Sequence, residues 1–517
     1  MVAIFNDPYV LTQPNTGREL TLIIDGDEFG ADFTTQEGYT VLFNDQIDMW
    51  VYADKASTGS LVPTTYPACS PAPSHLTKGL SDDPTKRMQI DRLRSERIEN
   101  RYFRQQVSGS GSPDVRHLTL GTNNGLLPGR SVSGNVRGLV VIVEFKDIKA
   151  FPNAVTLVDR MMNGNQPHLN NSTTVEGYFK TISNDELIIE NHVHPKIVTL
   201  SNNRSFYMRN SIVPHVLEAI RDEITFADYD SRDEGIVDSI SFLYAGDTVF
   251  GDPKNGTAEL WPHQYTYKVT KRENGRLYET YFYMLTSLGK DSNSLTIGTT
   301  CHELGHLLLR WPDLYDYGDR DGRGQEIGAG KSAGIGPYCL MGSGNDVGNG
   351  GRNPVPACGY LRQLSGFTNT TVVLNDTNQK HEVRADDYST IYRYDISTNE
   401  YFIIENHTSI GLRAGMGNIS GLAVMHCDTE GSNEWQINTP RYHYQTYLLQ
   451  ADGLEELERN RRANPEDLFK EVEGIALSFN TDPSTRAWDG SDSGLVIRDI
   501  SAPGRIMRFV SGPNSID

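Results

Sequence analysis

The stretch from Thr299 to Asp316 reads TTCHELGHLLLRWPDLYD, and the rest of the chain is interpreted from it. It contains His302, Glu303 and His306 in an H-E-x-x-H arrangement. Residues four apart on a helix lie on one face, so both imidazoles can bind one metal ion. The glutamate can then take a proton from water on that metal. Imidazole nitrogen suits zinc, so the sequence predicts a zinc site with an open coordination position.

The flanking residues favour a metal-binding helix over an ordinary amphipathic helix that carries two histidines. Leu304 and Leu307 place apolar positions between the ligands. Pro312 ends the helix, because the residue before a proline is biased away from helical conformation. Asp313 follows at once, and a carboxylate at this turn would complete the three protein ligands of a catalytic zinc site.

The motif HELGH, the string PDLYD and the later YCLMGSG from Tyr338 to Gly344 together resemble the immune-inhibitor-A-like secreted metallopeptidases, which are metzincin-like proteases. The resemblance extends over nearly the whole chain. It implies a zinc-dependent endopeptidase in which Glu303 is the general base. It also implies that Met341 forms the Met-turn, a methionine in a tight turn beneath the metal.

The third metal ligand departs from the family pattern. Metzincins place it ten residues after the first histidine, with a glycine three residues after the second. Here Leu309 occupies the glycine position and Pro312 the tenth position. Asp313 aligns through the PDLYD string and is the predicted third zinc ligand, with Asp316 and Glu326 as alternatives.

Composition limits the class of protein. The chain has 517 residues and a net charge of −20, which favours about three domains and argues against nucleic acid as a partner. No apolar run approaches the ~18 residues of a membrane helix. The first residues, MVAIFND, lack the basic and apolar regions of a signal peptide. The resemblance implies a secreted, extracellular protein, and unconventional export or retention inside the cell are the alternatives.

Residues 1–75 alternate in short apolar runs and predict a small β domain, which resembles the pro-region of the family. Residues 76–132 combine a charged helical stretch with a Gly/Ser-rich linker. Residues 133–368 contain the metal motif, and residues 369–517 carry the strand signals of an all-β sandwich. The predicted fold class is therefore α+β and multidomain, with a zincin or metzincin-like catalytic domain between a β pro-domain with a helical linker and a C-terminal β-sandwich.

A proenzyme needs an activation site and a means of latency. Exposed Gly/Ser stretches are readily nicked, so cleavage is predicted between about Ser108 and Arg137. Cys69 in the pro-region is a candidate blocking ligand for zinc, weighed against a spare thiol. The odd and sparse set of cysteines is no disulfide scaffold, although Cys339 with Cys358 is a candidate pair. The set is Cys69, Cys301, Cys339, Cys358 and Cys427.

A segment ahead of the metal motif gathers four carboxylates around a glycine. Spaced carboxylates with a turn-making glycine suit Ca²⁺, which takes six to eight oxygen ligands. The segment lacks the EF-hand spacing, and a solvated acidic turn is the alternative. The candidate calcium ligands are Asp228, Asp230, Asp233 and Asp238.

The sequence thus predicts a secreted zinc metalloendopeptidase, made as a latent zymogen, that hydrolyses protein or peptide substrates. His302, His306 and Asp313 hold zinc, and Glu303 activates water and passes its proton to the leaving amine. One rival is a non-catalytic adhesion or matrix-binding protein with a structural metal site. Another is a hydrolase of a non-peptide amide. Structural zinc usually has four protein ligands, so a three-ligand set with Glu303 favours catalysis.

Overall fold

The structure is a computed structural model with a mixed α+β fold built mainly from β-sheets. Glu326 and most of the predicted activation segment lie outside the described residues. The described residues are 4–13, 15–27, 29–81, 88, 90, 92–94, 119–120, 125–126, 133–164, 166–167, 170–248, 259–318, 331–348, 350–375, 378–436, 439 and 442–512.

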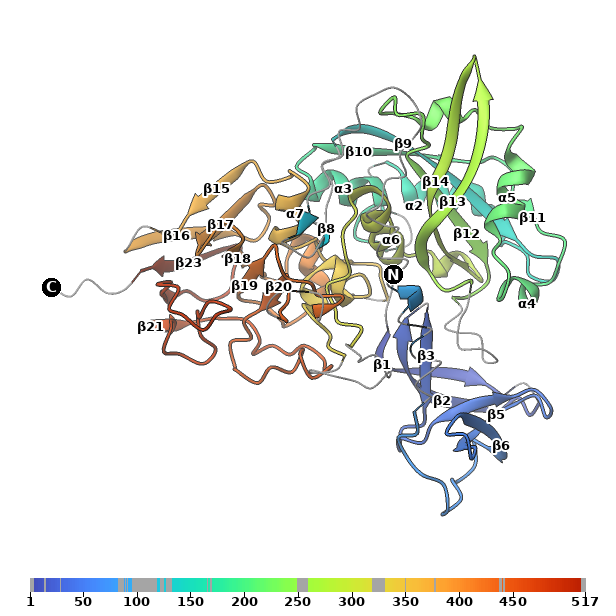
Figure 1. The fold of residues 1–517 in the computed structure, drawn as a ribbon. Helices are drawn as coiled ribbons and strands as arrows, with labels where there is room; N and C mark the ends of the chain where they lie inside the picture. Colours follow the sequence, from blue (N-terminus) through green and yellow to red (C-terminus); the bar gives the residue numbers. More distant parts are fainter. Residues whose placement is uncertain are drawn as a thin grey trace.

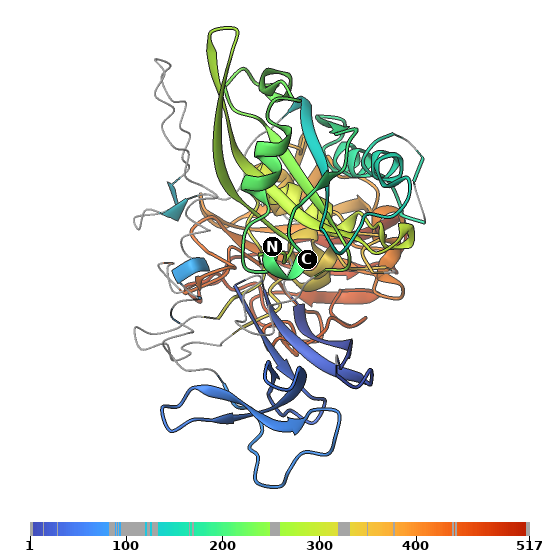
Figure 2. The ribbon, with the colours of Figure 1, turned by 90° about the vertical axis from the view of Figure 1, so that its right-hand side faces the viewer.

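The N-terminal unit consists of two antiparallel sheets that lie below the rest of the molecule in Figures 1 and 2. Leu22, Ile24 and Trp50 are buried in a core of its own. The Gln13 amide exchanges two hydrogen bonds with the Trp50 backbone, both 2.8 Å long, and so ties the sheets together. The strands are β1 (Ile4–Thr12), β2 (Glu19–Asp27) and β3 (Gly30–Thr34), then β4 (Val41–Asn44), β5 (Met49–Lys55) and β6 (Leu61–Pro67).

A central mixed sheet carries the elements around the metal motif. Its order is β10-β9-β12-β14-β13, in which the first four strands are parallel and β13 runs antiparallel to β14. A short strand, β11 (Val198–Thr199), also pairs with β9. The main strands are β9 (Gly134–Glu144), β10 (Leu187–Val193), β12 (Ser239–Ala245), β13 (His263–Glu273) and β14 (Arg276–Gly289).

Helices cover both faces of this sheet, which explains why β9 is a continuous apolar run. Val140 and Ile142 face one core, and Val141 and Val143 face the other, as the two-residue period of a strand requires. The first core includes α2 (Ala154–Met162), α3 (Val175–Ile182) and α6 (Gly298–Leu309). The second includes residues of α4 (Arg204–Tyr207) and α5 (Val213–Ile220). Figure 1 shows α6 between the central sheet and the C-terminal strands.

The C-terminal region packs two sheets against each other. One has the order β15-β17-β18-β19-β20 and the other β16-β23-β22-β21. Phe402 and Val424 of the first sheet share a core with Met507 and Phe509 of the second. The strands are β15 (Thr370–Val373), β16 (Gln379–Arg384), β17 (Thr390–Asp395), β18 (Glu400–Asn406), β19 (Leu422–Asp428), β20 (Thr446–Leu448), β21 (Val472–Leu477), β22 (Ile497–Ile500) and β23 (Ile506–Ser511).

The other face of β18 and β19 belongs to the core around the metal helix. Ile403, Met425 and Cys427 lie in the same apolar cluster as Leu304 and Leu307 of α6. The C-terminal sheet therefore forms part of the packing that positions the metal motif, although the sequence predicts a separate domain from residue 369.

Shorter elements connect these layers. They are β7 (Thr119–Leu120), β8 (Gly125–Leu126), η1 (Phe226–Tyr229), η2 (Ser292–Ser294), η3 (Gly336–Tyr338), η4 (Leu340–Gly344), α7 (Gly359–Leu364) and η5 (Gly411–Met416). Among the described residues, no helix has the length and apolar character needed to span a membrane.

Candidate metal centre

Helix α6 is held between other elements at its two glycines. A Cβ on Gly298 would lie 1.8 Å from the Asn345 carbonyl oxygen. A Cβ on Gly305 would lie 2.8 Å from the Trp311 ring and 3.0 Å from the Met341 sulfur. Any side chain at either position would force backbone or a packed ring to move. Met341 thus packs directly against the helix, at the turn between the two histidines.

The chain reverses direction immediately after α6. Arg310 has a φ of 56°, the left-handed conformation that few side chains adopt, and its N–H donates to the Gly305 carbonyl. Its guanidinium lies over the Phe282 ring, 3.5 Å from the centroid. The turn therefore falls on Arg310, directly after the end of α6 and three residues before Asp313.

The structure brings together three of the predicted ligands. His302 Nε2 and His306 Nε2 lie 3.1 Å apart, and Asp313 Oδ1 lies 3.1 and 3.3 Å from them respectively. All three side chains are 0% exposed. Ligand atoms at 2.0–2.1 Å from a tetrahedral zinc lie about 3.3 Å from one another. The spacing of the three atoms therefore fits one zinc ion.

The other nitrogen of each ring fixes the orientation of the imidazole. His302 Nδ1 lies 3.0 Å from the Leu340 carbonyl oxygen, and His306 Nδ1 lies 2.5 Å from that of Trp311. A carbonyl oxygen only accepts, so each Nδ1 carries the hydrogen and a neutral ring presents its Nε2 lone pair. Two lone pairs and a carboxylate oxygen within 3.3 Å repel one another, and a shared cation removes that repulsion.

Two residues that the sequence analysis did not single out hold Asp313. The Tyr317 hydroxyl donates to Asp313 Oδ2 at 2.8 Å, and the Asp313 N–H donates to Glu434 Oε1 at 3.0 Å. Tyr317 could have been found from its place four residues after Asp313. Glu434 is 121 residues away, and no local pattern marks it.

Glu303 and the alternative ligands have distinct places. Glu303 follows His302 on α6 and is 0% exposed. Asp316 instead accepts hydrogen bonds from the Gly318 N–H, at 2.8 Å, and from the Gln436 amide. Cys69 packs against the core of the N-terminal unit rather than against the histidines. The structure therefore favours Asp313 over Asp316 as third ligand and gives Cys69 no contact with the triad.

The N-terminal unit docks beside the metal turn. Asp27 and Arg94 form a buried ion pair of 2.6 Å, and the Arg94 guanidinium lies 5.0 Å from the centre of the Tyr317 ring. Phe29 joins Tyr315 and Tyr317 in a small apolar cluster. The unit therefore contacts the tyrosine that holds the third ligand.

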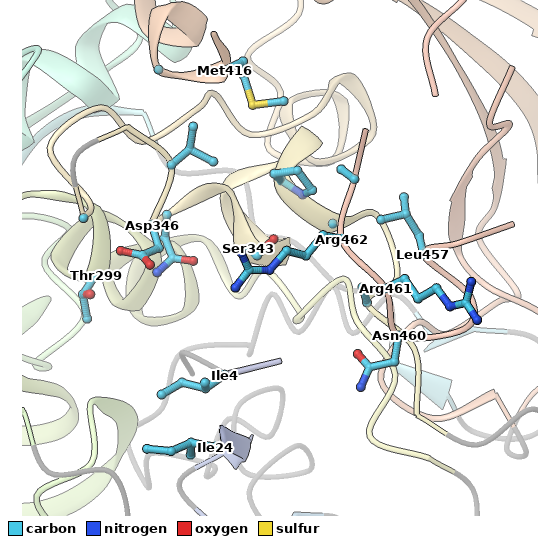
Figure 3. Close-up of a pocket in the computed structure, with 18 of the residues that line it drawn as sticks. Ile4, Ile24, Thr299, Ser343, Asp346, Met416, Leu457, Asn460, Arg461 and Arg462 are labelled. Atoms are coloured by element: carbon cyan, nitrogen blue, oxygen red, sulfur yellow. The ribbon is translucent and has the colours of Figure 1, made fainter. Parts of the chain in front are cut away.

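A cavity of about 990 Å³ lies between the N-terminal unit and the rest of the chain. Figure 3 shows Ile4 and Ile24 on one side and Thr299, on the first turn of α6, on another. Ser343, just after the Met341 turn, also lines it. The three metal-binding side chains and Glu303 do not line this cavity, and all four are 0% exposed. A substrate therefore cannot reach these four side chains in this structure.

The four predicted calcium ligands do not converge among the described residues, which include the whole acidic segment. Asp238 pairs with Arg232 at 2.5 Å, and Asp230 lies 3.4 Å from the Arg276 guanidinium. Asp233 also pairs with Arg276. Asp228 is exposed. Arginines therefore supply the positive charge at this segment.

A different acidic group does converge. Asp452, Glu456 and Asp467 each place a carboxylate oxygen within 4.8 Å of the others. The Asn464 amide lies between them, at 3.4, 2.5 and 3.2 Å from the three side chains. This amide carries two hydrogens, so it can donate to two of the three carboxylates at once.

Comparison with known proteins adds no relative. No protein-family model matches the chain, and no curated protein matches it. The chemistry of the site is therefore inferred from its own residues and their geometry.

Proposed function

We propose that this protein is a zinc-dependent endopeptidase whose N-terminal unit keeps it latent. One observation carries the proposal: two imidazole nitrogens and a carboxylate oxygen converge within 3.3 Å, and backbone carbonyls fix both rings. Nitrogen and oxygen donors in a set of three are typical of catalytic zinc. Bound zinc would supply the Lewis acidity that makes water a nucleophile and polarises the peptide carbonyl.

The protein residues have separate roles in this mechanism. His302, His306 and Asp313 would hold the ion. Glu303 takes the proton of the attacking water and delivers it to the leaving amine. Tyr317 and Glu434 orient Asp313 through its second carboxylate oxygen and its backbone N–H. Full burial of these groups strengthens their electrostatic interactions with a substrate once it is admitted.

The latency part of the proposal is supported by the position of the N-terminal unit. Ile4 and Ile24 form part of the wall of the cavity beside α6, and Arg94 covers Tyr317. Cleavage in the segment after Arg94 would free the unit to leave. The catalytic groups would then become accessible without any change in their own positions.

The alternative is a non-catalytic binding protein with a structural metal, and the complete burial of the site favours it. A structural site usually has a fourth protein ligand. Among the described residues, the group that contains His302 has three members.

The test joins metal analysis to activity. The full-length chain is purified, and half is nicked by limited proteolysis between residues 108 and 137. Zinc per chain and casein cleavage are measured for both forms, with and without chelator. We expect one zinc in each form and chelator-sensitive cleavage after nicking only. One zinc without cleavage in either form would favour the binding protein, and folded protein without zinc affinity would overturn the proposal.

A further inference from the structure

Two buried cysteines lie next to each other beneath the metal helix. Cys339 immediately precedes η4, and Cys358 immediately precedes α7. The Cys358 N–H lies 3.2 Å from Cys339 Sγ, and the two thiols hydrogen-bond to each other. The neighbouring backbone is also paired, because the Leu340 N–H donates to the Pro356 carbonyl at 3.3 Å. Both side chains are fully buried.

We propose that Cys339 and Cys358 form a disulfide that ties the Met341 turn to α7. The structure holds the two thiol groups within hydrogen-bonding contact, and proximity of the two sulfurs is one requirement for a bridge. This inference does not depend on zinc or catalysis. It requires that the chain folds in an oxidising compartment.

The bridge forms by two thiol–disulfide exchanges with a small disulfide such as oxidised glutathione. One cysteine thiolate attacks the glutathione disulfide, forms a mixed disulfide and releases one glutathione thiol. The second cysteine attacks the mixed disulfide, forms the Cys339–Cys358 bond and releases the second thiol. Two cysteine hydrogens and two electrons thus pass to one glutathione disulfide. Because both side chains are buried in the folded chain, the exchange takes place during folding.

The position of the bridge gives it a consequence for the metal centre. Leu340, the residue after Cys339, supplies the carbonyl that accepts from His302 Nδ1. A covalent link at Cys339 limits the motion of that carbonyl. The link also closes a loop across a separation of 19 residues, which reduces the entropy of the unfolded chain.

The other three cysteines are different. Cys301 is buried within α6, and Cys427 Sγ lies 3.6 Å from Thr446 Oγ1 and 3.8 Å from the Met425 carbonyl. Cys69 lies in the N-terminal unit. We expect all three to stay reduced.

The test counts thiols in the full-length chain. Protein folded with oxidised and reduced glutathione is denatured, alkylated with iodoacetamide without reductant, digested and analysed by mass spectrometry. We expect three alkylated cysteines, five after reduction, and one linked peptide that joins Cys339 to Cys358. Five alkylated cysteines without reduction, or a link that involves another cysteine, would overturn the proposal.

Thermal unfolding provides a second measurement. Reductant should lower the Tm of the wild-type chain by several degrees and leave that of Cys339→Ser and of Cys339→Ser/Cys358→Ser unchanged. The single and double variants should have the same Tm, because either removes the whole bridge. Cys427→Ala is the matched control, and it should keep the wild-type response to reductant. A wild-type Tm that does not respond to reductant would contradict the bridge.

Discussion

The metal triad and the acidic segment before β12 both gather carboxylates that the sequence identifies as candidate cation ligands, yet they are neutralised differently. At the acidic segment, Arg232 and Arg276 supply the positive charge directly to Asp230, Asp233 and Asp238. At the triad, the two imidazoles direct their Nδ1 hydrogens away to carbonyls and bring their Nε2 atoms together. Carboxylate spacing alone therefore does not identify a metal site; the cations that the protein itself supplies must be counted.

The largest effect is expected at Glu303. Glu303→Gln keeps the shape of the side chain and removes the base, so kcat of the nicked protein should fall roughly 10²- to 10⁴-fold. Zinc content should remain one per chain. The control is Asp233→Asn, which makes the same chemical change at the acidic segment and should leave kcat unchanged. Normal turnover by Glu303→Gln would remove Glu303 from the mechanism.

A third cluster of buried charged side chains surrounds His407, and its members neutralise one another without a metal ion. His407 faces Glu405 at 3.4 Å and Arg413 at 3.0 Å, and it packs beside the Tyr338 ring. Arg362 pairs with Glu405 at 2.6 Å from the other side. Burial, with the charge of Arg413, lowers the pKa of His407 from 6.5 to about 4.

This shift predicts a loss of stability in acid. The unfolded chain takes up a proton at His407 below pH 6.5, whereas the folded chain does so only near pH 4. The free energy of unfolding should thus fall by roughly 3 kcal/mol between these pH values. Burial raises the pKa of Glu405, but Arg362 and His407 outweigh burial and hold this pKa well below 4.5. The stability that ionised Glu405 contributes is therefore lost only at still lower pH.

Urea unfolding of chelator-treated protein at several pH values measures this effect without bound metal. His407→Gln keeps a hydrogen-bond acceptor but does not titrate, so its unfolding free energy should vary less with pH between 6.5 and 4. His192→Gln, at an exposed histidine, should keep the wild-type pH dependence. Equal slopes for His407→Gln and wild type would contradict the assignment.

A smaller effect is expected at the tyrosine that holds the third ligand. Tyr317→Phe removes the hydrogen bond to Asp313 Oδ2 and should weaken zinc binding roughly 10- to 100-fold. Competition with a fluorescent zinc chelator measures the affinity. Tyr360→Phe removes another fully buried tyrosine hydroxyl in the core and should leave it unchanged. Wild-type affinity in Tyr317→Phe would show that this hydrogen bond does not support the ligand.

The smallest effect is expected at the acidic segment. Its pair of Asp233 with Arg276 is largely solvent-exposed, so Asp233→Asn should change the free energy of unfolding by less than about 1 kcal/mol. Any rise in Tm on addition of calcium should be the same in Asp233→Asn and wild type. A calcium response that disappears in the variant would restore the calcium site that the sequence offers as a candidate.

Local sequence patterns predicted the features that depend on neighbouring residues in the chain. The H-E-x-x-H spacing placed both imidazoles on one helical face, and the apolar run of β9 indicated a strand buried on both sides. The choice of Asp313 followed from the proline stop and the resemblance, and the side chain does lie beside both histidines.

Contacts between residues far apart in the chain could not be predicted from local sequence patterns. Arg276 reaches Asp230 and Asp233 across more than 40 residues of chain, so the acidic segment looked like a metal site when read alone. The same is true of Glu434 on the Asp313 amide and of the Leu340 carbonyl on His302. The left-handed turn at Arg310 was also not predicted, since arginine seldom adopts it.

The strand pair β18–β19, buried on both faces, determines how the molecule can come apart. One face of the pair packs with α6 and the other with the second C-terminal sheet. Unfolding of the pair would therefore expose both cores to solvent. Calorimetry should therefore record these two layers melting as one cooperative transition, with the N-terminal unit, which has its own core, free to melt separately. Trimming the chain after residue 368 would remove Glu434 and the C-terminal residues that pack in the same core as the metal helix, among them Ile403, Met425 and Cys427.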